Sequence, residues 1–355
     1  MHWDAQELPI GTLQERVARL RGAMERDGLQ AMLLYTNLVR PSAVSYLTGF
    51  TPYWSEGILL VARDGEPTFA TALSKRVAEW IRSVSPVGEI VNDPRPGTIL
   101  AQRVIADGGV KRVGIVELDA FPAGSYDDFV AGAPALQIAD ATQLFARVRR
   151  GADAAERRLL GRADAIAAAA LDQVDAAAAE DAGSIAGQIE HHARVHGAEE
   201  AYLTVAPDLA SDRRMIGATP ARPLADRFAV RASIAYKGHW IRRTRTFAKD
   251  PDARAVVARG DEWFAQVLSS LAADTPLAEQ IAGRVDGLAG AEVKGWMAES
   301  CLGSYPLQVI AGSRSGNGDV LQIGDFLVLT IELSLDGTPW LGAAPLIVGG
   351  GLCIP

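Results

Sequence analysis

The chain has 355 residues, of which 48% are hydrophobic and 22% charged, a composition typical of a globular protein with one large or two smaller domains. Its net charge of −8 comes without a broad basic run, which argues against nucleic acid as a partner. The two cysteines have no metal-ligand spacing, and no apolar stretch reaches the ~18 residues of a membrane-spanning helix.

The first residues show no charged region followed by an apolar stretch, so we expect no signal peptide, no membrane contact and a cytoplasmic location. Strands and helices then alternate, which predicts an α/β domain over residues 1–150. The predicted elements are a helix over 12–28, strands at 31–35, 44–50, 57–62 and 68–71, helices over 74–84 and 99–107, and a strand at 113–117.

An alanine-rich run changes the pattern after residue 150. Alanine is the strongest helix former, so residues 152–179 are interpreted as a nearly continuous helix that leads into a second domain over residues 151–355. The remaining predicted elements are a helix over 185–195, strands at 201–206, 228–236 and 239–247, helices over 252–271 and 277–288, and strands at 326–335 and 346–348.

Several short motifs occur in a recognisable order: Tyr-Leu-Thr-Gly-Phe at 46–50, a hairpin at 228–247 ending in Thr-Arg-Thr-Phe, and Thr-Ile-Glu at 330–332. In these motifs the chain resembles the creatinase, prolidase and aminopeptidase P family. The resemblance implies an α+β fold, in which a creatinase-like N-terminal α/β domain is followed by a pita-bread domain. It also implies a homodimer.

The sequence departs from that family at the metal site. Metal-dependent members supply two aspartates, one histidine and two glutamates to a pair of divalent metals. The resemblance places Arg231 and Arg242 at the aspartate positions and Trp296 at the histidine position, and it leaves no acid within residues 341–344. Only Glu332 is kept. Because one carboxylate cannot fill the coordination shell of a transition metal, we expect neither a metal nor another cofactor.

We expect Arg231 and Arg242 to face each other across the hairpin, with Glu332 as their partner. One interpretation is a buried Arg–Glu–Arg triad that structurally replaces the metals. The other is that one arginine binds a carboxylate or phosphate of the substrate, because the planar guanidinium suits bidentate anion binding. Glu332 is then the candidate base, since nearby arginines favour its charged form; simple charge balance is the alternative.

Four further residues are substrate-binding candidates: His239, Trp296, Tyr53 and Trp54. His239 follows the hairpin turn and can equally be a surface residue of that turn. Trp296 either fills the volume of the absent metals or forms a wall of a substrate pocket. Tyr53 and Trp54 follow the Thr-Gly-Phe element, and the resemblance implies that this region can approach the site of a neighbouring subunit.

Two other places carry polar residues that the resemblance brings near the site. Asp208, Arg213 and Arg214 lie in the loop of residues 207–214, for which a solvated loop is the main interpretation. Glu299 lies in the region that replaces the family's histidine.

These residues support two functional hypotheses. The first is a metal-independent enzyme that acts on a small anionic, amino-acid-derived substrate by C–N hydrolysis, elimination or cyclisation, in a specialised pathway. The second is an inactive pseudo-peptidase that serves as a peptide- or protein-binding module. An active metallopeptidase is not expected, because four ligand positions carry unsuitable residues.

Overall fold

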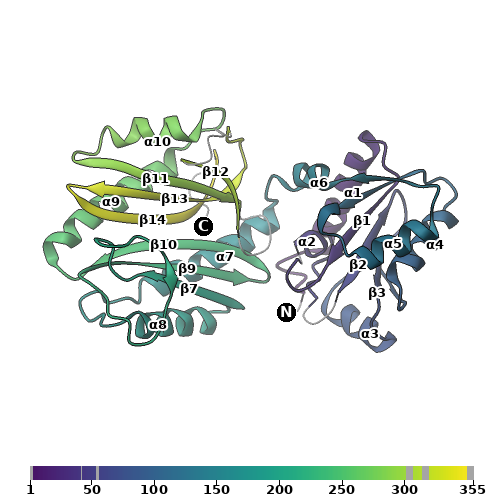
Figure 1. Cartoon of the computed structure of the whole chain (residues 1–355), viewed down its shortest axis with the longest axis horizontal. Helices are drawn as coiled ribbons and strands as arrows, with labels where there is room; N and C mark the ends of the chain where they lie inside the picture. Colours follow the sequence, from purple (N-terminus) through teal and green to yellow (C-terminus); the bar gives the residue numbers. More distant parts are fainter. Residues whose placement is uncertain (1–2, 41, 53–55, 301–306, 314–319, 350–355) are drawn as a thin grey trace. The chain divides into compact units, whose positions relative to one another are not determined.

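The computed structural model describes residues 3–40, 42–52, 56–300, 307–313 and 320–349. The chain divides into two compact units, Met1–Arg150 (unit 1) and Gly151–Pro355 (unit 2), each with its own sheet and core (Figure 1). Within the described segments, no helix is long and apolar enough to cross a membrane.

Unit 1 is built on a sheet with the strand order β4-β3-β2-β1-β5-β6 in its described residues. The strands are β1 (Ala31–Thr36), β2 (Gly57–Ala62), β3 (Thr68–Thr71), β4 (Glu89–Asn92), β5 (Arg112–Val116) and β6 (Gln137–Asp140). The helices are α1 (Ile10–Arg26), α2 (Ser42–Thr48), α3 (Lys75–Val84), α4 (Pro96–Ala106), η1 (Leu118–Ala120), α5 (Ala123–Gly132) and α6 (Thr142–Arg149).

The helices of unit 1 cover both faces of this sheet because its strands alternate apolar side chains toward each face. Leu34 of β1 belongs to the core formed with α1, α2, α3 and α6, whereas Leu33 belongs to the core formed with α4 and α5. Close approach of α4 to α5 requires a glycine, since a Cβ on Gly97 would lie 2.2 Å from the backbone oxygen of Ser125.

The strand predicted at 44–50 is wrong, because the chain forms helix α2 there. Val44, Leu47 and Thr48 are buried at helical spacing, and the Thr48 hydroxyl donates to the carbonyl oxygen of Val44 at 2.7 Å. A short apolar run fits a buried helix as well as a buried strand, so periodicity alone did not decide between them. Helix α5 and strands β4 and β6 were not predicted.

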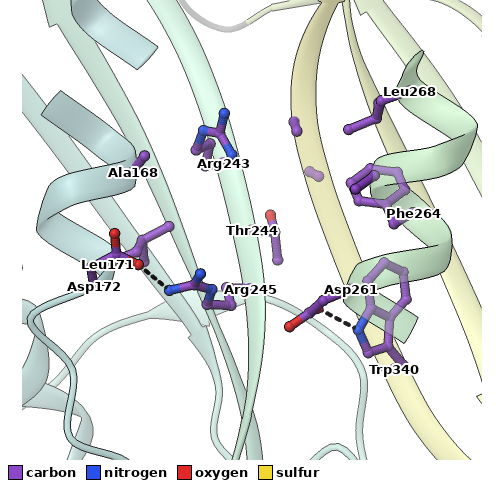
Figure 2. A pocket seen from close by; sticks show the side chains of 13 residues that line it. Ala168, Leu171, Asp172, Arg243, Thr244, Arg245, Asp261, Phe264, Leu268 and Trp340 are labelled. Atoms are coloured by element: carbon purple, nitrogen blue, oxygen red, sulfur yellow. Dashed lines mark hydrogen bonds and ion pairs between the residues drawn. The ribbon is translucent and has the colours of Figure 1, made fainter. Parts of the chain in front are cut away.

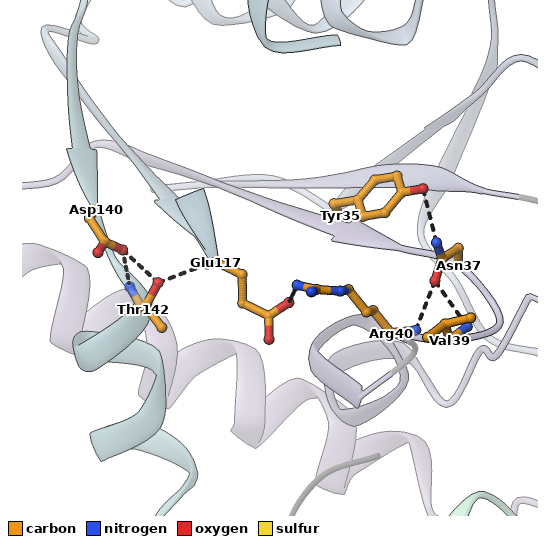
Figure 3. A network of polar contacts seen from close by, with 7 residues as sticks. All are labelled: Tyr35, Asn37, Val39, Arg40, Glu117, Asp140 and Thr142. Atoms are coloured by element: carbon orange, nitrogen blue, oxygen red, sulfur yellow. Dashed lines mark hydrogen bonds and ion pairs between the residues drawn. The ribbon is translucent and has the colours of Figure 1, made fainter. Parts of the chain in front are cut away.

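A polar network joins the carboxyl ends of β1, β5 and β6 (Figure 3). The Thr142 hydroxyl donates to Asp140 Oδ1 at 2.5 Å and accepts from the backbone N–H of Glu117 at 2.8 Å. Glu117 adopts a left-handed φ of 54° and forms an ion pair with Arg40 at 3.3 Å. The network holds together the loops that follow the parallel strands.

Unit 2 contains an antiparallel sheet whose described strands have the order β12-β11-β13-β14-β10-β9-β7-β8. The strands are β7 (Glu200–Ala206), β8 (Ile216–Gly217), β9 (Arg227–Tyr236), β10 (His239–Ala248), β11 (Ala291–Ser300), β12 (Gln308–Gly312), β13 (Phe326–Leu335) and β14 (Thr338–Ile347). The helices are α7 (Ala154–Leu171), α8 (Ala182–Val195), α9 (Pro251–Ser270) and α10 (Leu277–Val285).

The alanine-rich helix is shorter than predicted. Helix α7 ends at Leu171, and Asp181 then caps α8 by accepting hydrogen bonds from the backbone N–H groups of Gly183 and Ser184. Alanine propensity is a weak prior that tertiary packing overrides, and Val174, Ala176 and Ala179 pack against the core without continuing the helix. Strand β11 was not predicted. Strand β14 was predicted only at 346–348, because its Pro, Gly and Ala residues are poor strand formers and hide the longer strand.

The two faces of this sheet have different surroundings. Helices α7, α8, α9 and α10 pack on one face, where the apolar side chains of β9, β10, β13 and β14 form two cores (Figure 1). Alternation along the strands places another set of side chains on the opposite face, called the site face below. The site face carries Arg231, Arg242, Thr244, Glu299 and Glu332.

Candidate functional site on the unit 2 sheet

The two arginines of the β9–β10 hairpin are diagonal neighbours on the site face. Arg242 pairs with Ser233 and Arg231 pairs with Thr244, so the prediction that the arginines lie directly opposite each other is wrong. The turn is centred between Lys237 and Gly238, one position later than expected. Moving the centre of the turn by one residue shifts every cross-strand partner by two residues, which separates the two guanidinium groups.

Arg242 forms a buried ion pair with Glu299 of β11. Its Nη1 donates to both carboxylate oxygens at 2.5 Å, and the two side chains are only 8% and 4% exposed. The Nε of Arg242 also lies 3.4 Å from the hydroxyl of Ser233. The predicted partner, Glu332, does not contact Arg242 in the hydrogen bonds and ion pairs of the described chain. The expected Arg–Glu–Arg triad is therefore absent from the described residues.

Glu332 of β13 instead pairs with Arg213, whose Nη1 donates to Glu332 Oε1. The two side chains remain 35% and 30% exposed, several times more than the Arg242–Glu299 pair. Arg213 comes from the loop after β7, which is anchored by Leu209 packing against Leu341 and Ala229 on the site face. The loop thus places a guanidinium over the one acid kept from the family's ligand set.

Arg231 lies on the same face, where its Nε donates to the Thr244 hydroxyl at 3.2 Å. Thr244 pairs with Ala343, and Ala343 pairs with Thr330, so a row of small side chains runs across the sheet from Arg231 toward β13. Thr330 is 7% exposed, and its hydroxyl is buried without a hydrogen-bond partner. These three residues are almost fully buried, with Thr244 5% and Ala343 2% exposed.

Two aromatic residues of the site face were not predicted. Tyr202 of β7 and Trp240 of β10 stack with their ring centroids 5.3 Å apart and an interplanar angle of 5°. Their register places them on the same face as Ser233 and Arg242, and Tyr202 is 46% exposed. The alternation of Trp240 and Arg242 along β10 was the available signal. The pair forms an apolar end to the polar face.

The remaining predicted residues do not join this group. His239 lies beside the turn, where its Nδ1 is 2.9 Å from the carbonyl oxygen of Lys237. Trp296 pairs with Ile331, and both pack into the core on the helix-covered face rather than beside Glu332. Trp296 therefore lies away from Glu332, and it lines a different pocket together with Ile281, Val285 and Val293, so its part in substrate binding stays a prediction. Tyr53 and Trp54 lie outside the described residues.

Comparison with known protein families gives a match to unit 1. A model of the creatinase/prolidase N-terminal domain matches residues 16–150. The N-terminal unit is a creatinase/prolidase N-terminal domain. No curated protein matches the chain.

Solved structures match the chain over nearly its full length. The Xaa-Pro dipeptidase from Bacillus anthracis has a TM-score of 0.72 at 18% identity, with 95% of each chain covered. The X-Pro aminopeptidase from Thermotoga maritima MSB8 has a TM-score of 0.71 at 14% identity, with 94% of this chain and 98% of that chain covered. The prolidase from Pyrococcus horikoshii OT3 has a TM-score of 0.68 at 13% identity, covering 95% and 96%. The predicted two-part creatinase-like and pita-bread fold is confirmed.

The donor set on the site face does not fit the metal pair of metal-dependent creatinase/prolidase relatives. Arginines occupy the two positions that the resemblance assigns to aspartate ligands, and both nearby glutamates already accept hydrogen bonds from arginines. Within the described ranges, no three His, Cys, Asp or Glu residues are grouped so that they could hold a metal ion. Fixed cations beside each carboxylate repel a divalent metal.

Proposed function

We propose that this chain is a metal-independent enzyme that acts on a small anionic, amino-acid-derived substrate, with Glu332 as the base. The Arg213–Glu332 pair carries the proposal, because it is one-third exposed and formed between a strand and a loop. A pair of this exposure contributes little to stability, so a ligand can exchange with it. The buried Arg242–Glu299 pair has no such access and holds β10 to β11.

Substrate binding begins with exchange of partners at Arg213. A substrate carboxylate that binds the Arg213 guanidinium competes with Glu332 for the same donors. Glu332 is then released beside the bound substrate with its charge intact. Arg231, held by Thr244 on the neighbouring strand, supplies positive charge on the other side of the small residues Ala343 and Thr330.

C–N hydrolysis fits this arrangement without another cofactor. Glu332 accepts a proton from a water molecule, and the resulting hydroxide attacks the carbon of the C–N bond. Positive charge from the arginines stabilises the negative charge that develops on the substrate. The proton on Glu332 is then transferred to the leaving nitrogen as the bond breaks, which restores the carboxylate. Elimination and cyclisation need the same base and differ in the atom from which the proton is taken.

A thermal-shift screen followed by a turnover assay tests the proposal. The purified protein is screened against amino acids, guanidino acids, dipeptides and acyl phosphates, each with EDTA and with Mn²⁺, Co²⁺ or Zn²⁺. We expect stabilisation by one class of anion and no response to metal or chelator. Stabilisation by a divalent metal together with destabilisation by EDTA would contradict the proposal.

For the ligand found, the Glu332→Gln variant should lose turnover by about 10²- to 10⁴-fold, the usual contribution of a general base. Arg213→Lys should mainly raise KM, because the ammonium group cannot bind a carboxylate bidentately. The matched control is Glu292→Gln, since Glu292 pairs with Lys294 at the surface of β11. Full activity in Glu332→Gln would remove Glu332 from the chemistry.

The second candidate function is an inactive binding module. The buried Arg242–Glu299 pair favours it, because Glu299 is committed to a structural contact. Binding of the same anion class without conversion in a single-turnover experiment would select this function. For either function we propose a homodimer in the cytoplasm, which light scattering on the purified protein and localisation of a tagged copy test.

A further inference from the structure

A pocket of about 300 Å³ lies on the helix-covered face of the unit 2 sheet, between α7 and α9 (Figure 2). It shares Thr244 and Ala343 with the row of small side chains described above, but neither Glu332 nor Arg213 lines it. Its volume lies at the lower end of the range of small-molecule pockets. The lining side chains come from β10, β14 and the two helices: Ala168, Leu171, Asp172, Arg243, Thr244, Arg245, Asp261, Phe264, Ala265, Leu268, Trp340, Ala343 and Ala344.

Both arginines of the lining are neutralised by aspartates of α7 and its C-terminal cap. Arg243 donates through Nε and Nη2 to the two oxygens of Asp164, which is almost fully buried. Arg245 Nη1 donates to Asp172 Oδ1 at 2.5 Å, in a pair whose side chains are 42% and 59% exposed. The cations of the pocket are therefore already matched by two carboxylates.

Asp261 of α9 adds a third carboxylate to the wall. Its Oδ1 accepts a hydrogen bond from the indole Nε1 of Trp340 at 2.9 Å, and no ion pair within the described part of the chain includes it. Burial raises the pKa of Asp261, while the Trp340 hydrogen bond and the charge of Arg245 lower it less. A cation that replaces the lost water stabilises a half-buried carboxylate in this position.

The other wall residues are apolar. Phe264 packs edge-on against Trp340 with ring centroids 5.4 Å apart, Leu268 extends this surface along α9, and Leu171 of α7 lies on the other side of the pocket. Aromatic faces beside a carboxylate attract an ammonium group, because the ring quadrupole and the charge act together. Figure 2 shows Asp261 and Trp340 on one side of the pocket and the Arg245–Asp172 pair on the other.

We propose that this pocket binds a small protonated amine with a short branched apolar body, whose ammonium group donates to the second oxygen of Asp261. The apolar body then lies against Phe264 and Leu268. An anion is disfavoured there, because Arg243 and Arg245 are paired and Asp261 repels it. The inference does not rest on the proposed function, since the charged residues that line the pocket include neither Glu332 nor Arg213.

The test is a calorimetric titration of the full chain with 3-methylbutylammonium. A ligand of this size binds on the order of millimolar. The uncharged analogue 3-methylbutan-1-ol has the same skeleton and should bind about tenfold or more weakly. Asp261→Asn keeps the acceptor for Trp340 but removes the charge, so it should weaken amine binding by a similar factor without changing alcohol binding.

Arg245→Gln is a matched variant for which we expect the opposite change in amine affinity. It removes a cation near the amine and releases the Asp172 carboxylate toward the pocket, so amine affinity should rise. A variant that misfolds cannot produce that rise. Equal amine affinity in the wild type and Asp261→Asn, equal binding of amine and alcohol, or weaker binding in Arg245→Gln would overturn the proposal.

Discussion

Removing one partner of the buried Arg242–Glu299 pair should destabilise unit 2 strongly. In Glu299→Gln, the Arg242 guanidinium keeps its charge but loses the carboxylate that binds Nη1 through both oxygens at 2.5 Å. The side chain is 8% exposed, so water cannot replace the lost partner. A buried charge left without its partner costs about 3–5 kcal/mol, which corresponds to a fall in Tm of about 6–20 °C for a unit of this size.

Replacing both partners should have a much smaller effect. The double variant Arg242→Met/Glu299→Leu removes both charges and fills the space with apolar groups of similar volume. Replacements of this kind are neutral or stabilising by about 1–4 kcal/mol in comparable buried pairs. Ser233 Oγ loses one long contact of 3.4 Å with Arg242 Nε, which adds little. The double variant should therefore be more stable than either single variant.

Scanning calorimetry of the full chain, with the unit 2 transition compared among the variants, measures both effects. Glu190→Gln is the control, since Glu190 pairs with Arg194 on the surface of α8 with both side chains 46% exposed. Loss of that pair should change stability by less than about 1 kcal/mol. If Glu299→Gln matched this control, or if the double variant were less stable than the single ones, the reasoning from burial would be refuted.

Three further predictions follow from the surroundings of Tyr35, Gly97 and Asp261. Burial and the hydrogen bond to Glu56 raise the pKa of Tyr35 to about 12, so an ultraviolet titration should show one tyrosine ionising about 2 pH units late, and Tyr35→Phe should remove that step. Gly97→Ala should destabilise unit 1 by about 1–3 kcal/mol in urea unfolding, because its Cβ would lie 2.2 Å from the Ser125 oxygen. Asp261→Asn should raise Tm at neutral pH. That gain should shrink as the pH falls. The pKa of Asp261 is raised in the folded state, so proton binding stabilises the folded wild type at low pH, and this stability is lost as the pH rises through that pKa.

The architecture could be predicted where hydrophobic periodicity is long. The helix expected at 12–28 begins at residue 10 and ends at residue 26, and the hairpin strands differ from expectation by one residue at their ends. Amphipathic repeats of this length leave one choice of element. The strand β11 (Ala291–Ser300) was missed, since its glycine, its alanines and the bulge near Gly295 hide the alternation.

The partners of the arginines could not be predicted in the same way. Contact between Arg242 and Glu299 depends on the strand order that brings β11 and β13 beside β14 and β10. Motifs from the family resemblance gave the positions along the chain, but not which side chain crosses the sheet to which partner. Arg213 belongs to a loop that was interpreted as solvated, and local sequence holds no sign that the loop packs over Glu332.

The site face holds two ion pairs with different surroundings. Arg242 has the structural part, because its glutamate is buried and held by both oxygens. We propose the ligand-binding part for Arg213, because the side chains of its pair with Glu332 are 35% and 30% exposed. In the proposed function, the accessible pair supplies the anion-binding guanidinium and the base, whereas the buried pair stabilises the sheet. A stability assay on Glu299 and a turnover assay on Glu332 therefore examine separate properties of the same face.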